Sequence, residues 1–444
     1  MFSKILIANR GEIAIRVIRA CKEMGIASVA VFSEADRESL HVSLADESYC
    51  IGGALSKDSY LKKEAVISAA LASKAEAIHP GYGFLSENAE FAKMCVDNGI
   101  VFIGPNSETI SKMGDKDMAR RTMIEAGVPV IPGCDLVENL EHAKKEAKQI
   151  GFPLLIKARS GGGGKGIRHV SSMDELEQSY NTATAEAASA FGDGAVYMER
   201  YLFPVKHIEM QLLADNFGNV VCLGERDCST QRKNQKLIEE SPAAVISDET
   251  REKMFDASVK AGIAVGYKGA GTIEYLYDKD GNFYFMEMNT RLQVEHPVTE
   301  MVTLIDLVKW QIRVASNMKL EFTQDDIKFT GHAIECRINA ENPYQDFRPA
   351  GGKVEMLHVP SGPWVRFDSA IYQGYTIPPF YDSMIGKLIV YAKTRDEAIR
   401  KMKAALCELI IEDIVHTAPF QADLLSTEEF ADSSYTTDFV LKYL

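Results

Sequence analysis

The chain has few cysteines, and their spacing excludes the usual cysteine-based sites. Eight cysteines are scattered over 444 residues, and no two of them form a CxxC pair. Zinc ribbons and redox-active dithiols need such pairs, and small disulfide-stapled domains need a much higher density. We therefore expect reduced cysteines in the cores of a cytoplasmic protein.

Long apolar runs and an excess of positive charge are also missing. No apolar run approaches the ~20 residues that cross a bilayer, and Asn9-Arg10 interrupts the first one, so we expect neither a membrane span nor a signal peptide. Lys and Arg number 49 against 63 Asp and Glu, a formal net charge of −14. This balance argues against nucleic acid or an anionic membrane as the main partner.

What is present is an ordinary globular composition, long enough for about three domains at ~150 residues each. The first hundred residues alternate strand patterns (4–8, 28–32, 77–79, 100–103) with helix patterns (12–24, 60–73). This alternation predicts a parallel, doubly wound (Rossmann-like) sheet with a ligand crevice at the carboxyl ends of its strands. Gly81-Tyr82-Gly83 follows one strand end, either as a crevice loop or as a plain turn.

The rest of the chain reads as α+β. A linker or strand is predicted at 128–133, a helix at 138–149 and a strand at 154–157. The last third, from about residue 331, contains strand patterns at 333–338, 353–358 and 387–391 and a closing helix pattern at 395–409.

A glycine-rich segment at 161–166 follows the strand pattern at 154–157. Glycine lets backbone N–H groups approach a phosphate closely, although a plain surface turn is an equal alternative. The segment is not a Walker A loop, because Gly166 stands where Ser or Thr is required. Lys157 lies in an apolar strand context, and a buried lysine needs a partner, so an anionic ligand nearby is a reasonable explanation.

Two aromatic strand patterns flank Asp280-Gly281, which predicts a hairpin with a two-residue turn. That register pairs Tyr277 with Tyr284, Leu276 with Phe285 and Glu274 with Glu287. Directly opposed carboxylates repel each other, so either they turn into water or a divalent cation lies between them.

Strand alternation favours the cation. It puts Glu287, Asn289 and Arg291 on one face and Tyr284, Met286 and Met288 on the other. Ligands that offer only oxygen suit Mg²⁺, which also bridges nucleotide phosphates. A glycine loop, a strand lysine and a magnesium pair together indicate ATP-dependent phosphoryl chemistry.

Four further segments have a specific family pattern. They read NRGEIA at 9–14, HPGYGFLSEN at 79–88, RLQVEHPVTE at 291–300 and HAIECRINAE at 332–341. Together with the glycine loop and the hairpin, they resemble biotin carboxylase, as in the free-standing subunit of bacterial acetyl-CoA carboxylase. The likeness extends from residue 1 to about 409.

This resemblance implies an ATP-grasp architecture in three parts: an N-terminal domain at 1–114, an ATP-grasp domain at 115–330 with its lid at about 131–202, and a C-terminal domain at 331–444. It implies that ATP and bicarbonate, with Mg²⁺ or Mn²⁺, form carboxyphosphate, and that the carboxyl group passes to biotin. This is the first half-reaction towards malonyl-CoA in fatty acid synthesis. The implied partners are a biotin carboxyl carrier protein, carboxyltransferase subunits and a second copy of the chain. No Ala-Met-Lys-Met biotin-attachment segment is present in the sequence, so we expect biotin to arrive on another polypeptide.

The resemblance also implies roles for matching residues. Glu295 would be the general base for bicarbonate, and Arg337 would stabilise the biotin enolate. Bicarbonate and biotin would be bound by Lys236, Arg291, Gln293, Val294, Glu295, Arg337 and Tyr82, and the metal by Glu274, Glu287 and Asn289. The nucleotide would contact Lys116, Lys157, Gly163, Gly164, Lys165, Gly166, Glu199, Arg200, Tyr201, Leu202, His207, Gln231, Asn234 and Lys236, with Glu274 and Glu287 reached through the metal.

Three departures from the family pattern stand out. Asn234 replaces a usual histidine, Arg200 replaces a common lysine, and residues 416–419 differ from the usual pattern. Other interpretations are another ATP-grasp ligase, a subunit of another acyl-CoA or pyruvate carboxylase, and a non-catalytic nucleotide-binding scaffold. The scaffold should have lost Glu287, Glu295 or Arg337, and the chain keeps all three.

Overall fold

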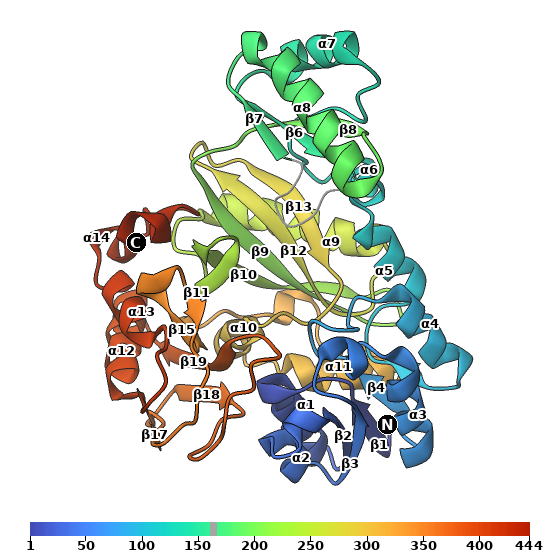
Figure 1. Ribbon diagram of the computed structural model, residues 1–444, viewed down its shortest axis with the longest axis vertical. Helices are drawn as coiled ribbons and strands as arrows, with labels where there is room; N and C mark the ends of the chain where they lie inside the picture. The colour runs from blue at the N-terminus through green and yellow to red at the C-terminus, as the bar shows by residue number, and fades with distance from the viewer. Residues whose placement is uncertain (160–166) are drawn as a thin grey trace.

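The N-terminal part of the chain is a five-stranded sheet covered by helices on both faces. The computed structural model describes residues 1–159 and 167–444. The strand order is β3-β2-β1-β4-β5, and every pairing is parallel (Figure 1). The strands are β1 (Lys4–Ile7), β2 (Ala27–Ser33), β3 (Glu47–Gly52), β4 (Ala77–His79) and β5 (Val101–Phe102). The helices of this part are α1 (Gly11–Glu23), α2 (Leu40–Leu44), α3 (Lys63–Ser73), α4 (Ala89–Asp97) and α5 (Ser107–Gly114).

Side-chain alternation along β1 explains the two covered faces. Ile5 and Ile7 pack in one apolar cluster with residues of α1, whereas Leu6 packs in another with residues of α3 and α4. A strand buried on both faces has a continuous apolar sequence, as this one does. The predicted doubly wound parallel sheet is confirmed.

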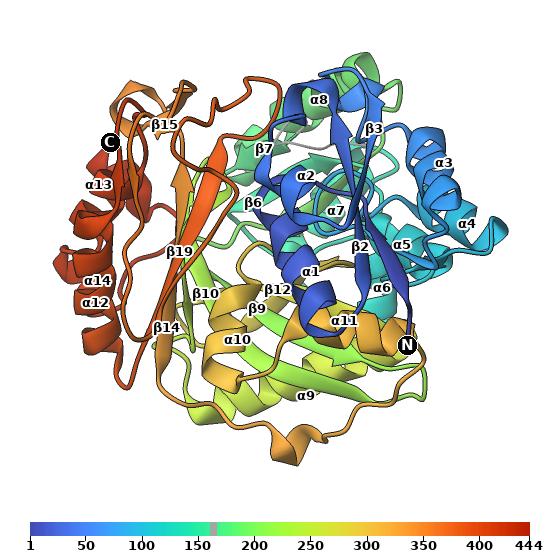
Figure 2. The same ribbon diagram turned by 90° about the horizontal axis from the view of Figure 1, so that it is seen from below.

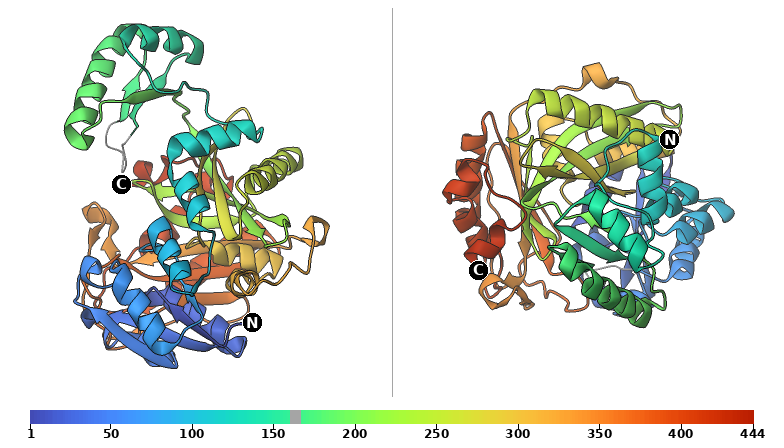
Figure 3. Two further views of the ribbon diagram at one scale, coloured as in Figure 1. Left: turned by 90° about the vertical axis from the view of Figure 1, so that its right-hand side faces the viewer. Right: turned by 90° about the horizontal axis from the view of Figure 1, so that it is seen from above.

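A smaller unit projects from the body of the molecule. Its antiparallel sheet, in the order β7-β6-β8, carries helices on one side (Figures 1 and 3). The chain reaches it through α6 (Lys116–Glu125), and its elements are α7 (Leu140–Ile150), β6 (Leu154–Ala158), β7 (Ile167–Val170), α8 (Met173–Phe191) and β8 (Val196–Arg200). It has an apolar core of its own, formed by residues between 137 and 198.

A long antiparallel sheet forms the body. Its order is β13-β12-β9-β10-β11-β14-β19-β18, with all pairings antiparallel. The strands are β9 (Val205–Ala214), β10 (Val220–Arg232), β11 (Gln235–Ser241), β12 (Gly269–Asp278), β13 (Phe283–Asn289), β14 (His332–Asn339), β18 (Val365–Ser369) and β19 (Met384–Ala392). Because β11 pairs with β14, the sheet continues across the predicted domain boundary at 330/331.

Helices cover this sheet at three places. α9 (Asp248–Ala264) packs on β9 and β10, while α10 (His296–Thr303) and α11 (Leu307–Ala315) lie on the side of the N-terminal sheet. The C-terminal helices cover the outer side of β14 and β19 (Figure 2), and they are α12 (Arg395–Glu408), α13 (Ala418–Leu424) and α14 (Glu428–Ala431). Two-residue strands pair at the margins: β15 (Glu341–Asn342) with β16 (Arg348–Pro349), and β17 (Leu357–His358) with β20 (Ile410–Ile411).

Some predicted elements are wrong or incomplete. The strand predicted at 353–358 is reduced to Leu357–His358, and 128–133 contributes only isolated bridges such as Val130 to Phe285. The helix predicted at 395–409 does not close the fold, because α13, α14 and the 3-10 turn Phe439–Tyr443 follow it. None of the helices described is both long and apolar enough to cross a membrane.

Candidate functional site

Most of the sequence-predicted site residues surround one cavity of about 490 Å³ beside the long sheet. Those lining it are His207, Gln231, Asn234, Lys236, Glu274, Glu287, Asn289, Arg291, Gln293, Val294, Glu295 and Arg337. Two neighbouring cavities share residues with it. One, of about 710 Å³, extends toward the projecting unit and contains Lys116, Lys157 and Glu199, and the other, of about 530 Å³, extends toward the N-terminal sheet and contains Tyr82.

The hairpin β12–β13 brings Glu274 opposite Glu287, as predicted, but by a different route. The predicted pairs Tyr277–Tyr284 and Leu276–Phe285 are wrong, since Tyr277 pairs with Phe283 and Leu276 with Tyr284. The connection is longer than two residues, because β12 ends at Asp278 and β13 begins at Phe283. A bulge between the Glu274–Glu287 and Tyr275–Phe285 pairs restores the carboxylate pairing.

The same bulge changes which side chains share a face. Met286 is the extra residue of the bulge, and it lines the cavity together with Glu287 instead of pointing away from it. Met288 instead packs in the buried core with Phe283 and Phe285. The predicted strict alternation is therefore wrong at Met286, because a bulge inserts one residue into the two-residue period.

Lys236 on β11 is the centre of charge in the cavity. Its Nζ lies 2.6 Å from Glu209, 2.9 Å from Glu274 and 2.5 Å from Glu295. Burial would lower the pKa of Lys236, but these carboxylates outweigh burial and hold it well above its ordinary value. The lysine is therefore a permanent cation that ties β9, β12 and the start of α10 together.

Glu295 is held between two cations. Lys236 contacts one carboxylate oxygen, and Nη2 of Arg337 donates to the other at 2.8 Å. Burial would raise the pKa of Glu295, but Lys236 and Arg337 outweigh it and hold the pKa well below its ordinary value. Glu295 is the N-cap residue of α10 without a capping hydrogen bond, so its carboxylate is directed at the cavity and not at its own helix.

The segment Arg291 to Glu295 is a turn, so the strand face predicted for Glu287, Asn289 and Arg291 ends before Arg291. β13 ends at Asn289, and α10 begins at His296. Arg291 donates to Asn289 at 2.9 Å and to Glu87 at 2.8 Å, while the Gln293 amide donates to Glu274 at 2.7 Å. The turn, not alternation, directs these side chains at one cavity.

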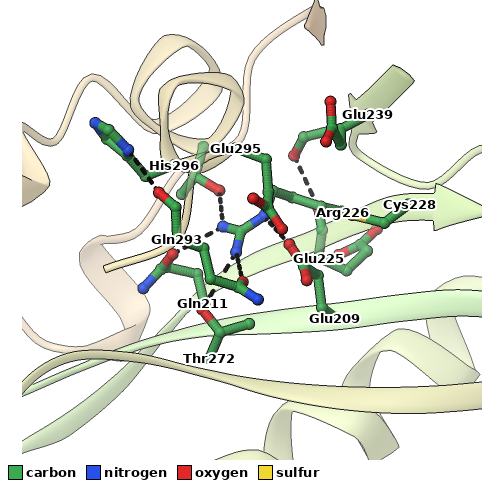
Figure 4. A network of polar contacts seen from close by, with 12 residues as sticks. Glu209, Gln211, Glu225, Arg226, Cys228, Glu239, Thr272, Gln293, Glu295 and His296 are labelled. Carbon is green, nitrogen blue, oxygen red and sulfur yellow. Dashed lines mark hydrogen bonds and ion pairs between the residues drawn. The ribbon is translucent and has the colours of Figure 1, made fainter. Parts of the chain in front are cut away.

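A buried arginine that the sequence analysis did not single out supports this floor. Arg226 on β10 is 0% exposed, and its guanidinium donates to side chains of five residues (Figure 4): Glu209, Gln211, Thr272, Gln293 and Thr299. The signal available in the sequence was the run of charged and polar residues at 225–232 that follows the apolar first part of the strand. A buried charge persists only when it is fully hydrogen-bonded, as this one is.

The donor set fits Mg²⁺ at Glu274, Glu287 and Asn289, which offer only oxygen. Burial and then the charge of Glu274 raise the pKa of Glu287, and no hydrogen bond or ion pair to Glu287 occurs among the described residues. A cation would relieve that repulsion. Two other groups of possible ligand atoms are compact, namely His207, Glu209 and Glu274, and Glu209, Cys228 and Glu295. Both of these groups include Glu209, which Arg226 and Lys236 already neutralise, so we favour Glu274, Glu287 and Asn289 as the metal ligands.

On the side of the projecting unit, the predicted nucleotide residues are more dispersed. Lys116 begins α6, and Lys157 on β6 pairs with Glu199 on β8 at 2.5 Å. The partner of Lys157 is therefore a carboxylate of the chain itself, where the sequence suggested a bound anion. Arg200 ends β8, Tyr201 and Leu202 follow it in the connection to β9, and none of the three lines the cavities. Gly163, Gly164, Lys165 and Gly166 lie outside the described residues.

Asn234 lies in the tight turn between β10 and β11. Its φ is +63° and that of Lys233 is +48°, a backbone conformation that asparagine adopts more readily than most residues. Nearby, Gln231 Nε2 lies 2.7 Å from His207 Nδ1, while His207 Nε2 lies 3.0 Å from Glu274. Asn234 therefore projects a short amide into the cavity where the family usually has an imidazole.

Comparison with known proteins matches every part of this chain. Residues 1–110 match the biotin carboxylase N-terminal domain, residues 115–323 the ATP-binding domain of the carbamoyl-phosphate synthase L chain, and residues 335–442 the biotin carboxylase C-terminal domain. Biotin carboxylase 1 of Bacillus subtilis is 56% identical over 445 residues, covering 100% of this chain and 99% of that protein.

Solved structures agree with this match. A biotin carboxylase–β,γ-ATP complex from Campylobacter jejuni superposes with a TM-score of 0.94 at 50% identity, covering 100% of this chain and 99% of the other. The biotin carboxylase domain dimer of Hydrogenobacter thermophilus 2-oxoglutarate carboxylase, in complex with MgADP, ADP and bicarbonate, gives 0.93 at 49% identity, covering 100% and 98%. With three domain matches in order and relatives aligned end to end, this chain belongs to the biotin carboxylase family.

Proposed function

We propose that the protein uses ATP and bicarbonate to carboxylate biotin carried on a partner protein. The observation that carries this proposal is the position of Glu295 between Lys236 and Arg337, in a cavity that shares residues with both of its neighbouring cavities. Arg291 lines all three cavities, and Arg337 lines two of them. A nucleotide, a small anion and a biotin ring could therefore approach one another there.

Glu295 has the properties of the base for bicarbonate. Its low pKa keeps it ionised at neutral pH, and Lys236 and Arg291 offer cations on the same cavity wall. When bicarbonate draws these cations to its own oxygens, Glu295 loses part of the charge compensation that holds its pKa down, and its basicity rises. Gln293 and the backbone of Val294 complete the wall around the anion.

The nucleotide has a matching set of residues. Lys116 and Lys157 reach the cavity of about 710 Å³ from α6 and β6, and the same cavity includes Glu287 and Asn289. Bound Mg²⁺ or Mn²⁺ would neutralise phosphate charge during phosphoryl transfer. Glu274, Glu287 and Asn289 would hold it, and Lys157 would exchange its contact with Glu199 for a phosphate oxygen.

Biotin fits the third cavity. Tyr82, Gly83 and Phe84 of the N-terminal part line it together with Arg337. The Tyr82 hydroxyl donates to Glu12, whose carboxylate also lies 3.1 Å from Lys387. These contacts fix the position of the Tyr82 ring. The planar guanidinium of Arg337 would stabilise an enolate oxygen on biotin.

We further infer the domain division 1–114, 115–330 and 331–444, with a lid at about 131–202, and a homodimer that works in the cytoplasm. We propose acetyl-CoA carboxylase as the assembly. The likeness to a 2-oxoglutarate carboxylase domain keeps another acceptor as the second candidate.

The test is ADP release with free biotin. We expect turnover that requires bicarbonate and Mg²⁺, rises with biotin and disappears with a chelator. A Glu295→Gln variant should still bind nucleotide but lose this turnover. Release of ADP at an unchanged rate without bicarbonate would contradict the proposal. To distinguish the two assemblies, the transfer of the carboxyl group from carrier-bound biotin is measured with purified transferase subunits for acetyl-CoA or for 2-oxoglutarate.

A further inference from the structure

Two buried glutamates without a role in the proposed reaction face each other behind Arg337. Glu239 on β11 and Glu335 on β14 are register partners, and both are 0% exposed. Directly opposed side chains lie ~4.5–5.5 Å apart at Cβ. Oε2 of Glu239 and both carboxyl oxygens of Glu335 have no hydrogen-bond partner among the residues the structure describes.

One member of the pair holds Arg337. Oε1 of Glu239 accepts from Nε of Arg337 at 2.5 Å, while Nη2 on the other side of the guanidinium donates to Glu295 at 2.8 Å. Nη1 makes no hydrogen bond or ion pair with another described residue. Glu239 on the Nε edge and Glu295 at Nη2 therefore fix the orientation of the guanidinium plane together, and Nη1 remains for a ligand.

Several titratable and charged groups face the pair, from β11, β14, β19, β10, the start of α10 and the N-terminal part. The cations are Lys236, Arg337 and Lys387, the anion is Glu295, and the groups neutral at pH 7 are Tyr82, Cys228 and Cys336. Lys387 is committed elsewhere, to the Val294 carbonyl at 2.8 Å and to Glu12 at 3.1 Å. Lys236 is committed to three other carboxylates.

The remaining cation, Arg337, cannot neutralise the facing carboxylates of both Glu239 and Glu335. An unpaired buried carboxylate is so unfavourable that such a group takes up a proton instead. Two close carboxyl groups then share that proton and titrate as a unit. Protonated Glu335 gains an O–H that can donate to Oε2 of Glu239, which provides a partner for atoms that otherwise have none.

We propose that Glu239 and Glu335 share one proton and act together as a positioning pair for Arg337, with the neutral Glu335 holding Glu239 as the carboxylate that orients the guanidinium. This inference rests on the proposed role of Arg337 toward biotin. Burial raises the pKa of Glu335 well above its ordinary value and, against the opposing effect of Arg337, raises the pKa of Glu239 to about 7.

Infrared difference spectroscopy of the full chain tests the shared proton without using activity. At pH 8, the Glu335→Gln variant should lose a carbonyl-stretch band of a protonated carboxylic acid that the wild-type protein shows. An unchanged band in the E335Q difference spectrum would mean that Glu335 is ionised, and the proposal would be wrong.

The pH profile of biotin-dependent ADP release tests the positioning role. In the wild type, protonation of Glu239 releases the Nε edge of Arg337, so turnover should fall as the pH drops through about 7. Glu239→Gln should lower kcat about 10-fold, leave KM for ATP unchanged and remove this acidic limb. Glu335→Gln keeps a neutral donor and should retain the wild-type profile, whereas Glu335→Leu should move the limb about 1 pH unit upward, since Glu239 loses its donor.

Glu225→Gln is the matched control. Glu225 is also buried and accepts a hydrogen bond of 2.8 Å from an arginine, Arg251, but it lines none of the three cavities. It should leave the pH profile unchanged. A wild-type profile in E239Q, or an altered one in E335Q, would overturn the proposal. If E335L does not fold, the pH profiles of E239Q and E335Q and the infrared band still test the proposed pair. Lack of any biotin stimulation in the wild type would instead contradict the proposed function, while the infrared result stands independently.

Discussion

The floor of the cavity and the projecting unit neutralise their charges in different ways. In the floor, Lys236 contacts three carboxylates and Arg226 five residues, so each cation has many fixed partners. Among the described residues, Lys157 and Arg168 of the projecting unit each have one carboxylate partner, and both members of the Arg168–Glu186 pair are partly exposed.

This difference teaches how the two regions can contribute to catalysis. A network whose dipoles and charges are fixed before the substrate arrives needs little reorganisation during the reaction. Single ion pairs near water are weak and are easily exchanged for a ligand. We therefore expect changes in the floor to affect turnover and stability, and changes in the projecting unit to affect nucleotide affinity.

The sharpest break of the floor is Glu295→Gln. Loss of a general base commonly costs 10²- to 10⁴-fold in rate, and we expect a fall of about that size in biotin-dependent ADP release. Nucleotide affinity, measured by calorimetry, should change little. Retained turnover in this variant would remove Glu295 from the proposed mechanism.

Arg226→Met should be the most destabilising change in this comparison. It removes the buried cation next to Glu209, and breaking a buried pair from one side costs about 3–5 kcal/mol in the free energy of unfolding. Denaturant unfolding measures this. Arg168→Met in the projecting unit, whose pair is partly exposed, should cost at most about 1 kcal/mol, and equal costs would contradict the comparison.

Lys157→Gln should weaken nucleotide binding about 10-fold, the value of one charge-assisted hydrogen bond, with little change in unfolding free energy. Titration calorimetry with ADP and Mg²⁺ measures the affinity. The control is Lys144→Gln on α7, whose partners Glu141 and Glu177 are exposed. A similar loss in both variants would mean that Lys157 does not reach the phosphates.

The smallest effect concerns Glu240, the neighbour of Glu239 on β11. Burial would raise its pKa, but His332 and Arg395 hold it far below its ordinary value. Because its pKa is lower in the folded state, the Glu240 carboxylate adds to the free energy of unfolding above the unfolded-state pKa of about 4.3. This contribution is lost as the pH falls below that value. Glu240→Gln should therefore flatten the loss of stability in acid, and an unchanged acid dependence would contradict the assignment.

Sequence patterns predicted the elements whose signal is local. β1, α1 and β6 follow from apolar runs and helical spacing, and the parallel sheet follows from the alternation of strand and helix patterns in the first hundred residues. The strand predicted at 353–358 failed because short marginal strands depend on their partners, here β20 and an isolated bridge at Lys353.

The site divides in the same way. The pairing of Glu274 with Glu287 was predicted correctly only because two departures from the predicted hairpin cancel: the connection is longer than two residues, and the bulge at Met286 restores the register. The bulge at Met286 and the roles of Arg226 and Glu239 were not predictable from spacing, because they depend on strands far apart in the sequence meeting in one sheet.

The sequence alone determined the family pattern, the residue types of the site and the strands and helices whose periodicity is local, because these are properties of neighbouring residues. The tertiary structure alone decided which charges neutralise each other. Electrostatic partners such as Arg337 and Glu239 lie 98 positions apart, and only the folded sheet brings them within hydrogen-bond distance.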